Sequence, residues 1–185
     1  MLAMRQRGSK KQVNNPEARP LTPEQLRART FQRAVKLLAA KPRSVAELRE
    51  RLAERCSNKV IVGTVIARLR EYGYLDDERY ALGYALLKVK QQPIGRRRLQ
   101  QALALKKIDR SVATEALDQV YAETSEEELI DRAIEKRIRL RGRPKNRAEA
   151  KSLFDHLLRQ GFPFELVSDK VRAASKAEIE DDTLE

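Results

Sequence analysis

The chain has 185 residues, of which 36% are charged and only 5% are aromatic, with seven glycines and seven prolines. This composition argues against a β-sandwich, which needs β-branched and aromatic residues, and favours helices with charged faces and modest aliphatic cores. The single cysteine, Cys56, excludes an internal disulfide and fits a reducing compartment.

The net charge of +12 is distributed unevenly along the chain. Residues 1–43 carry 11 Lys and Arg against 2 Asp and Glu, residues 44–121 carry 15 against 10, and residues 122–185 carry 13 against 15. A basic front and a short acidic end predict a polyanionic partner, or a partner surface of mixed sign. The alternative is that a basic arm only aids solubility.

No segment approaches the roughly 18 apolar residues that are needed to span a bilayer. The first residues, MLAMRQRGSKKQVNN, are basic but lack a following apolar core, so they do not resemble a secretory signal. We therefore expect a cytoplasmic protein with no membrane partner.

The first helix is expected to begin after Thr22. Residues 1–21 are polar and show no apolar periodicity, which predicts a disordered basic arm. Thr22 can cap the helix, Pro23 suits its first position, and Gln25 completes a capping box. An apolar stripe at helical spacing then follows, formed by Leu26, Phe31, Ala34, Val35 and Leu38.

Prolines recur at a fixed interval of 51 residues, at Pro42, Pro93 and Pro144. A helix-start pattern follows each one: a capping box from Ser44 to Glu47, Gly95 before Arg96, and Asn146 three residues before Glu149. A constant period of this length indicates internal repeats.

Aliphatic residues repeat in the same register. Leu52, Leu103 and Leu157 serve as anchors, one in each repeat. Four residues before the anchors stand Leu48, Leu99 and Leu153. Nine residues after them stand Ile61, Val112 and Leu166, and fourteen after them stand Ile66, Leu117 and Val171. The anchors are 51 and 54 residues apart, so the second helix of the last unit is expected to be about one turn longer.

These patterns predict an all-α fold of three tandem three-helix repeats that form an elongated, curved array. The expected helices span 23–40, 44–55, 59–72, 77–91, 95–106, 109–121, 126–141, 147–160 and 164–175. The expected repeats span 22–75, 76–122 and 123–175, followed by an acidic tail over 176–185.

The segment EYGYLDDERYALGYALLK, residues 71–88, is interpreted as the joint between the first two repeats. Gly73 is expected to end one helix, with Tyr74 and Leu75 packing back across the corner, and Asp76 or Asp77 to cap the next. Tyr80, Tyr84 and Leu87 are spaced as a stripe on that next helix. We expect Tyr74, Tyr80 and Tyr84 to pack the units together.

LREYGYLDDERYA (69–81), preceded by RSVAELRERLAER (43–55) and followed by GRRRLQQALALKKI (95–108), resembles the RecX regulatory family. Its members are bacterial modulators of the RecA recombinase and consist of three-helix repeats. The resemblance covers about residues 28–175. It implies that the partner is a RecA filament on DNA.

The loops between the last two helices of each repeat depart from the family pattern, which often has a lysine-glycine step there. The second repeat has Lys106-Lys107-Ile108 without glycine and the first has CSNK, whereas the third keeps Gln160-Gly161-Phe162. We expect only local loop differences from these departures.

No catalytic device is found in the sequence. The lone His156 has no second ligand or nucleophile at usable spacing, and Cys56 has no base. The carboxylates of Asp76, Asp77 and Glu78 are interpreted as helix-capping groups rather than as a metal site. We expect no enzyme activity and no cofactor.

Two basic clusters are the candidate binding residues. The first contains Lys88, Lys90, Arg96, Arg97, Arg98, Lys106 and Lys107, and the second contains Lys136, Arg137, Arg139, Arg141, Arg143, Lys145 and Arg147. Guanidinium groups suit phosphate or carboxylate recognition. The alternative is a solvated helix face with pairs such as Glu135–Arg139. Neither cluster interleaves aromatic residues, so base stacking is not indicated.

The function favoured at this stage is regulation of the RecA filament: a monomer that contacts several recombinase subunits, with inhibition of ATPase, strand exchange and co-protease activity. Single- or double-stranded DNA is a further candidate partner. A direct DNA-binding protein and a helical scaffold for some other partner are the alternatives.

Overall fold

The computed structural model describes residues 21–179, with side chains through Ser175. Across these residues the chain forms nine helices and no strand, so the predicted all-α fold is confirmed. The helices are α1 (Pro23–Ala40), α2 (Val45–Ala53), α3 (Lys59–Glu71), α4 (Asp77–Gln91), α5 (Arg96–Leu105), α6 (Arg110–Glu123), α7 (Glu126–Arg141), α8 (Arg147–Arg159) and α9 (Phe164–Ile179). The predicted disordered arm, apart from Leu21, and the last six residues of the predicted acidic tail lie outside the described residues.

Most helix bounds agree with the prediction within one or two residues. The main difference is α9, which continues to Ile179 rather than ending at residue 175. The second helix of the last unit is longer, as predicted, with 13 residues in α8 against 10 in α5. The capping box of Thr22 and Gln25 is present at the start of α1.

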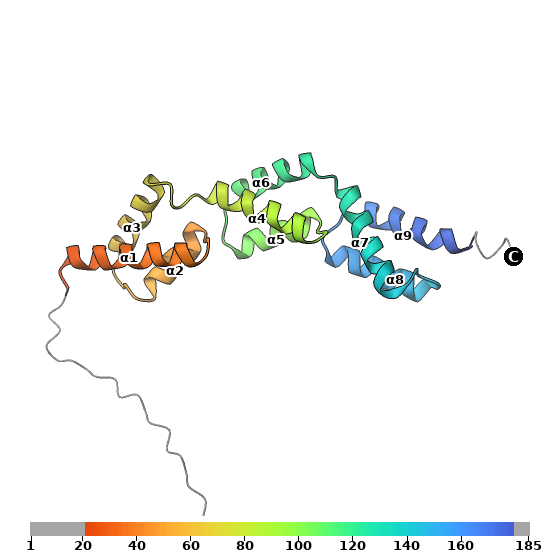
Figure 1. Cartoon of the computed structure of the whole chain (residues 1–185), viewed down its shortest axis with the longest axis horizontal. Coiled ribbons are helices and arrows are strands. Elements are labelled where there is room, and N and C mark those ends of the chain that lie inside the picture. The colour runs from red at the N-terminus through yellow and green to blue at the C-terminus, as the bar shows by residue number, and fades with distance from the viewer. Residues whose placement is uncertain (1–20, 180–185) are drawn as a thin grey trace, which may run out of the picture.

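Three groups of three helices follow one another along the long axis of an elongated molecule (Figure 1). In each group the second helix, α2, α5 or α8, lies toward the lower edge of the view. Helix α1 packs on α2 and α3, α4 on α5 and α6, and α7 on α8 and α9. The arrangement is the repeat array that the spacing predicts.

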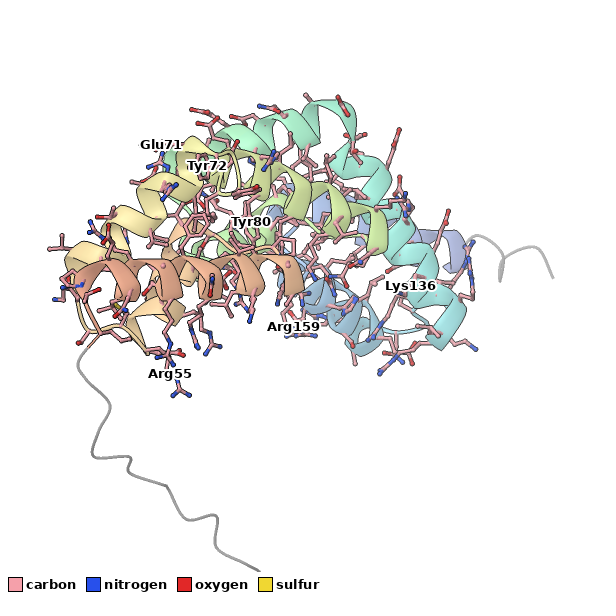
Figure 2. All side chains as sticks on the ribbon, turned by 60° about the vertical axis from the view of Figure 1, so that its left-hand side comes forward. Arg55, Glu71, Tyr72, Tyr80, Lys136 and Arg159 are labelled. Atoms are coloured by element: carbon pink, nitrogen blue, oxygen red, sulfur yellow. The ribbon has the colours of Figure 1, made fainter. Side chains whose placement is uncertain are left out.

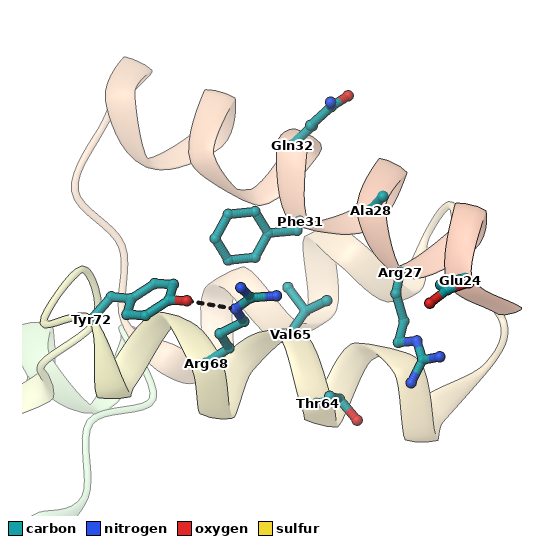
Figure 3. Close-up of a pocket in the computed structure, with 9 residues that line it drawn as sticks. All are labelled: Glu24, Arg27, Ala28, Phe31, Gln32, Thr64, Val65, Arg68 and Tyr72. Atoms are coloured by element: carbon teal, nitrogen blue, oxygen red, sulfur yellow. Dashed lines mark hydrogen bonds between the residues drawn. The ribbon is translucent and has the colours of Figure 1, made fainter.

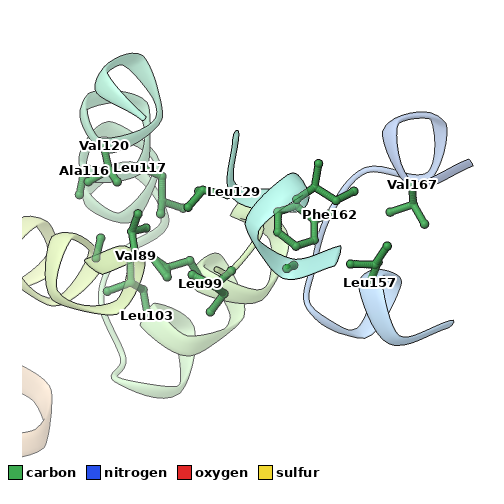
Figure 4. Packing of buried hydrophobic residues seen from close by; sticks show 14 of the residues in the cluster. Val89, Leu99, Leu103, Ala116, Leu117, Val120, Leu129, Leu157, Phe162 and Val167 are labelled. Carbon is green, nitrogen blue, oxygen red and sulfur yellow. The ribbon is translucent and has the colours of Figure 1, made fainter. Parts of the chain in front are cut away.

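The buried side chains form two hydrophobic cores. The first group of helices has its own core, which includes Leu48, Leu52 and Leu69. The second and third groups share a core, in which Leu99 and Leu129 belong to the same cluster as Phe162, the last fully buried (Figure 4). The second and third repeats are therefore packed together more extensively than the first and second.

The joint after α3 has the predicted glycine stop. Gly73 has a φ of 69°, and the N–H groups of Gly73 and Tyr74 donate to the carbonyls of Arg70 and Leu69. This pair of hydrogen bonds is a Schellman motif. Leu75 is buried, but Tyr74 is 60% exposed, so the prediction that Tyr74 packs the units together is wrong.

Two of the predicted apolar stripes, on α1 and α4, each include one residue that is exposed in the structure. Leu87 is 52% exposed and Val35 is 41% exposed. Helix α4 instead buries Ala81, Ala85 and Val89. These small residues allow close approach of α6, and the large neighbouring side chains are left at the edge of the contact.

A repeated set of hydrogen bonds joins each group to the next. At the first joint, the Ser44 hydroxyl at the start of α2 donates to the carbonyl of Lys106 at 2.6 Å. The N–H of Val45 donates to the Asp77 carboxylate at 2.9 Å. Asp76 caps α4 itself by accepting from the N–H of Arg79, which leaves Asp77 free for this contact.

The second joint uses the same positions. The N–H of Gly95 at the start of α5 donates to the carbonyl of Gln160 at 2.9 Å, and the N–H of Arg96 donates to the Glu126 carboxylate at 2.8 Å. At both joints, the start of one second helix meets the end of the next second helix and the first acidic residue of the next first helix. The joint therefore repeats along with the helices.

Candidate functional site

Three cations of the first predicted cluster are held in contacts within the array. The ammonium of Lys106 lies 3.0 Å from the Glu47 carboxylate, and this hydrogen bond raises the pKa of Lys106. Lys107 forms an ion pair with Glu50, and Arg96 forms one with Asp118. The first two pairs cross the joint between the first and second repeats, where they supplement the hydrogen bonds made by Ser44 and Val45.

The other four cations of the first cluster do not gather at one place. Arg98 donates to the side-chain oxygen of Gln160 at 2.5 Å, across the second joint. The Lys88 ammonium lies 5.6 Å from the ring centroid of Tyr84. Lys90 and Arg97 are exposed. The first cluster is thus spread between two joints and the surface.

The second cluster extends along the end of α7, through the loop, and into α8. Arg137 is half-buried and donates to the Ser152 hydroxyl at 3.3 Å. The remaining members are exposed; they are Lys136, Arg139, Arg141, Arg143, Lys145 and Arg147. None of these residues forms an ion pair with a described carboxylate, and Glu135 and Arg139 do not pair.

Four arginines from three helices lie near enough to His156 on α8 for their charges to act on it. Burial lowers the pKa of His156, and the charges of Arg137, Arg159, Arg98 and Arg141 lower it further. The pKa of Arg137 is also lowered, by burial and then by the nearby Arg141 and Arg159. We call Arg98, Arg137, Arg141 and Arg159 the arginine cluster. Like charges held this close repel one another, and a bound anion would relieve the repulsion.

The arginine cluster takes members from both predicted clusters and adds one residue that the sequence analysis missed. Arg159 stands in the last turn of α8, three residues after His156, so it lies on the same helix face. It is far from the predicted clusters in sequence, and only helical spacing from His156 could have indicated it. Figure 2 shows Lys136 on the teal helix α7 and Arg159 beside the blue helix α8.

Two surface hollows flank Arg137. One, of about 230 Å³, is lined by Arg137, Arg141 and Arg143 among others, and the second, of about 140 Å³, is lined by Lys136, Arg137 and His156 among others. The lining of the first also includes Glu149, and that of the second includes Ala133 and Leu140. Their chemistry suits oxyanions, since guanidinium groups bind phosphate and carboxylate through paired N–H donors.

Two aromatic residues, the half-buried Phe31 and the exposed Tyr72, lie elsewhere, in a groove of about 560 Å³ between α1 and α3 (Figure 3). The Arg68 guanidinium lies 5.5 Å from the ring centroid of Phe31 and 5.3 Å from that of Tyr72, and its Nε donates to the Tyr72 hydroxyl at 2.9 Å. These aromatic residues belong to the first repeat, whereas the arginine cluster lies at the joint of the second and third.

The other residue types considered for chemistry are the cysteine and the possible metal ligands. Cys56 is buried, and its thiol donates to the carbonyl of Asn58 at 3.8 Å. Among residues 21–179 no group of three or more His, Cys, Asp or Glu side chains could hold a metal ion. In the same part of the chain, no helix combines the length and the hydropathy that crossing a membrane requires.

Comparisons with known proteins agree with the repeat organisation. Residues 31–69 match the family model for the first three-helix domain of RecX, and residues 76–117 match that for the second. A crystal structure of RecX from Lactobacillus salivarius superimposes with a TM-score of 0.71 at 19% identity, covering 80% of this chain and 96% of that one. At this identity, the likeness shows the fold alone.

Curated relatives show the family. A regulatory protein RecX from Treponema pallidum is 35% identical over 109 residues, which are 59% of this chain and 66% of that protein, slightly under two thirds of its length. The regulatory protein RecX of Halorhodospira halophila is 34% identical over 152 residues, covering 80% of this chain and 88% of the relative. The chain belongs to the RecX family of regulatory proteins.

Proposed function

We propose that the protein binds the RecA–DNA filament and modulates it, mostly by inhibiting its ATPase, strand exchange and co-protease activity. Family membership supports a regulatory role, and the resemblance of the joint segment over residues 69–81 supports RecA as the partner. In this proposal the three repeats, over residues 22–75, 76–122 and 123–175, act together as one extended binding surface.

The observation that carries the proposal is the arginine cluster on an elongated array. A filament offers the same surfaces repeatedly along its length. A long molecule can contact several recombinase subunits at once, so that weak contacts add through effective concentration. If such contacts favour one filament state over another, binding shifts the population of states and alters activity.

The proposal places the main contacts on the second cluster and the arginine cluster. Their cations have no carboxylate partners among the described residues, and they are therefore available for an anionic partner. Lys88, Lys90 and Arg97 would add contacts along the middle repeat. Lys106 and Lys107 would contribute mainly by holding the first two repeats in register, whereas the guanidinium of Arg96 is paired with Asp118 within the second repeat.

The test is the ATPase rate of RecA on single-stranded DNA, measured while the protein is titrated at substoichiometric ratios. Loss of ATPase is expected with the unmodified protein and not with an Arg139→Glu/Arg141→Glu/Arg143→Glu variant. The matched control is Arg110→Glu/Arg132→Glu/Arg172→Glu, which reverses three exposed cations elsewhere on the array and should still inhibit.

Binding to naked DNA must be measured in parallel. A protein that binds DNA through phosphates loses affinity steeply as salt rises, whereas a filament-specific regulator needs the recombinase to be present. An unchanged ATPase rate, together with tight and salt-sensitive binding to DNA alone, would contradict the filament proposal and favour direct DNA binding.

A further inference from the structure

The outer end of the first repeat carries a basic pocket. Helix α1 and the end of α2 enclose a hollow of about 600 Å³. Its lining includes Arg29, Arg33, Lys36 and Arg55, and none of the described residues that line it is acidic. We call these four cations and the hollow between them the end pocket. Leu26 and Leu52 add apolar surface beside the charges.

The cations of the end pocket are not neutralised within the described part of the chain. None of the four forms an ion pair or a side-chain hydrogen bond with a residue in the range 21–175. The Nε–H of Arg33 is shielded from solvent and has no acceptor. A buried donor without an acceptor is costly, so an acceptor supplied by a ligand would be stabilising.

The second repeat shows what covers the equivalent surface. The buried residues Thr30 and Ala34 of α1 correspond to Ala81 and Ala85 of α4, at the same interval of 51 residues as the prolines. By this register, Arg29 and Arg33 occupy the positions of Tyr80 and Tyr84.

Tyr80 lies at the first joint, where the start of α2 covers it. Burial raises the pKa of Tyr80, and the neighbouring Glu47 raises it further. The end of α5 completes this covered surface, where Lys106 and Lys107 pair with Glu47 and Glu50 of α2. The occupant of the first joint is therefore a helix start with two carboxylates one turn apart.

We propose that the end pocket binds a partner protein through the start of an acidic helix, with carboxylates spaced as Glu47 and Glu50 are. The pocket repeats the geometry of a covered joint, but it replaces two tyrosines with two arginines. It therefore calls for more negative charge than α2 supplies at the first joint. Residues 1–20, which precede it in the chain, add five Lys and Arg against one Glu.

A second copy of this chain is a poor occupant. Among the helices of residues 21–179, the only second-helix start not used in a joint is that of α8, which is flanked by Lys145 and Arg147. The carboxylate of Glu149 at this start is already engaged, because it accepts from the N–H of Lys145 and from the side chain of Asn146. Two basic surfaces would repel each other, so an acidic partner of another kind fits better.

The inference goes beyond the proposed function, because it needs neither recombinase nor DNA. The probe is a fluorescent, acetylated helical peptide with a Ser cap and Glu at the third and sixth positions after it. A twin peptide carries Gln at both positions, and a labelled oligothymidylate of equal charge represents nucleic acid. Binding to the full chain is followed by fluorescence anisotropy.

We expect the Glu peptide to bind and the Gln peptide to bind at least about tenfold more weakly. Arg29→Glu/Arg33→Glu should lower the affinity for the Glu peptide by about tenfold or more. Arg55→Glu, at the end of α2, should also lower the affinity for the Glu peptide, and any effect of the other variant on the folding of α1 cannot account for this loss. Arg27→Glu/Lys41→Glu, which reverses two cations of the first repeat outside the pocket, should leave it unchanged.

Equal binding of the Glu and Gln peptides would overturn the inference, and so would an affinity that neither pocket variant changes. If the oligothymidylate binds and the pocket variants weaken that binding while the Glu peptide does not bind, the end pocket is a nucleic-acid phosphate site instead. Inhibition of RecA by the same variants, measured separately, shows whether the filament function survives in each case.

Discussion

Gly95 and Gly161 lie against each other where the second and third repeats meet. A Cβ built on Gly95 would overlap the carbonyl group of Gly161 and the N atom of Phe162, which are backbone atoms that cannot turn aside. The N–H groups of Gly95 and Arg97 donate to the carbonyls of Gln160 and Gly161. The joint therefore depends on the absence of a side chain at residue 95.

Gly95→Ala should separate this joint and destabilise the fold by about 1–3 kcal/mol, as overpacking of a tight interior contact does. The φ of Gly95 is −82°, which alanine accepts, so the expected loss comes from the contact alone. Chemical denaturation gives the free energy of unfolding. Gly83→Ala is the control: Gly83 is exposed on α4 with open space around it, and alanine there should stabilise by about 0.5–1 kcal/mol. Equal effects at both positions would contradict the close contact.

Lys107 occupies the position where the third repeat has Gly161. Both have positive φ, 58° and 91°, and Lys107 is the only described residue other than glycine in this region. Lys107→Gly and Lys107→Ala both remove the ion pair with Glu50, but only glycine removes the backbone strain. The glycine variant should therefore be the more stable by about 1 kcal/mol.

The neighbouring residue provides the control for that comparison. Lys106 has a φ of −82°, so at this position alanine should be at least as stable as glycine. Thermal unfolding of the four variants is sufficient. If glycine and alanine rank the same way at both positions, Lys107 is not strained.

The repeats, the helices and most buried positions could be predicted from the sequence, because helical periodicity and the interval of 51 residues both follow from the chain itself. The role of Asp77 could not be predicted in this way. Capping rules treat Asp76 and Asp77 alike, and only the fold brings Asp77 to the N–H of Val45. The same holds for the ion pairs of Lys106 and Lys107. A cluster of cations in the sequence does not reveal which carboxylates a neighbouring repeat will bring near.

His156 should report on the arginine cluster through its titration. Its pKa lies below the ordinary 6.5, owing to burial and to the neighbouring arginines. In the unfolded chain the imidazole of His156 takes up its proton near pH 6.5, whereas in the folded chain it does so only at a lower pH. The unfolded state therefore binds more protons as the pH falls below 6.5, and folding stability should decrease there.

The chain has one histidine, so an NMR titration of its ring protons is unambiguous. We expect a pKa below 6.5 for the free protein and a higher pKa when an oligonucleotide or inorganic phosphate is bound, since the anion offsets the arginine charges. His156→Gln should remove this part of the decrease in stability below pH 6.5. An unshifted pKa that does not respond to anions would contradict the grouping of these residues.

Arg141 should contribute to binding at a cost in stability. It is exposed, its charge lowers the pKa values of Arg137 and His156, and no described carboxylate pairs with it. Arg141→Gln removes repulsion and should leave the free energy of unfolding unchanged or raise it by up to about 0.5 kcal/mol. The same change should weaken the anionic interaction and reduce its salt dependence by about one charge. Arg132→Gln, on the same helix, is the control and should alter neither property, whereas a loss of stability in Arg141→Gln would show that Arg141 holds the fold together rather than serving a partner.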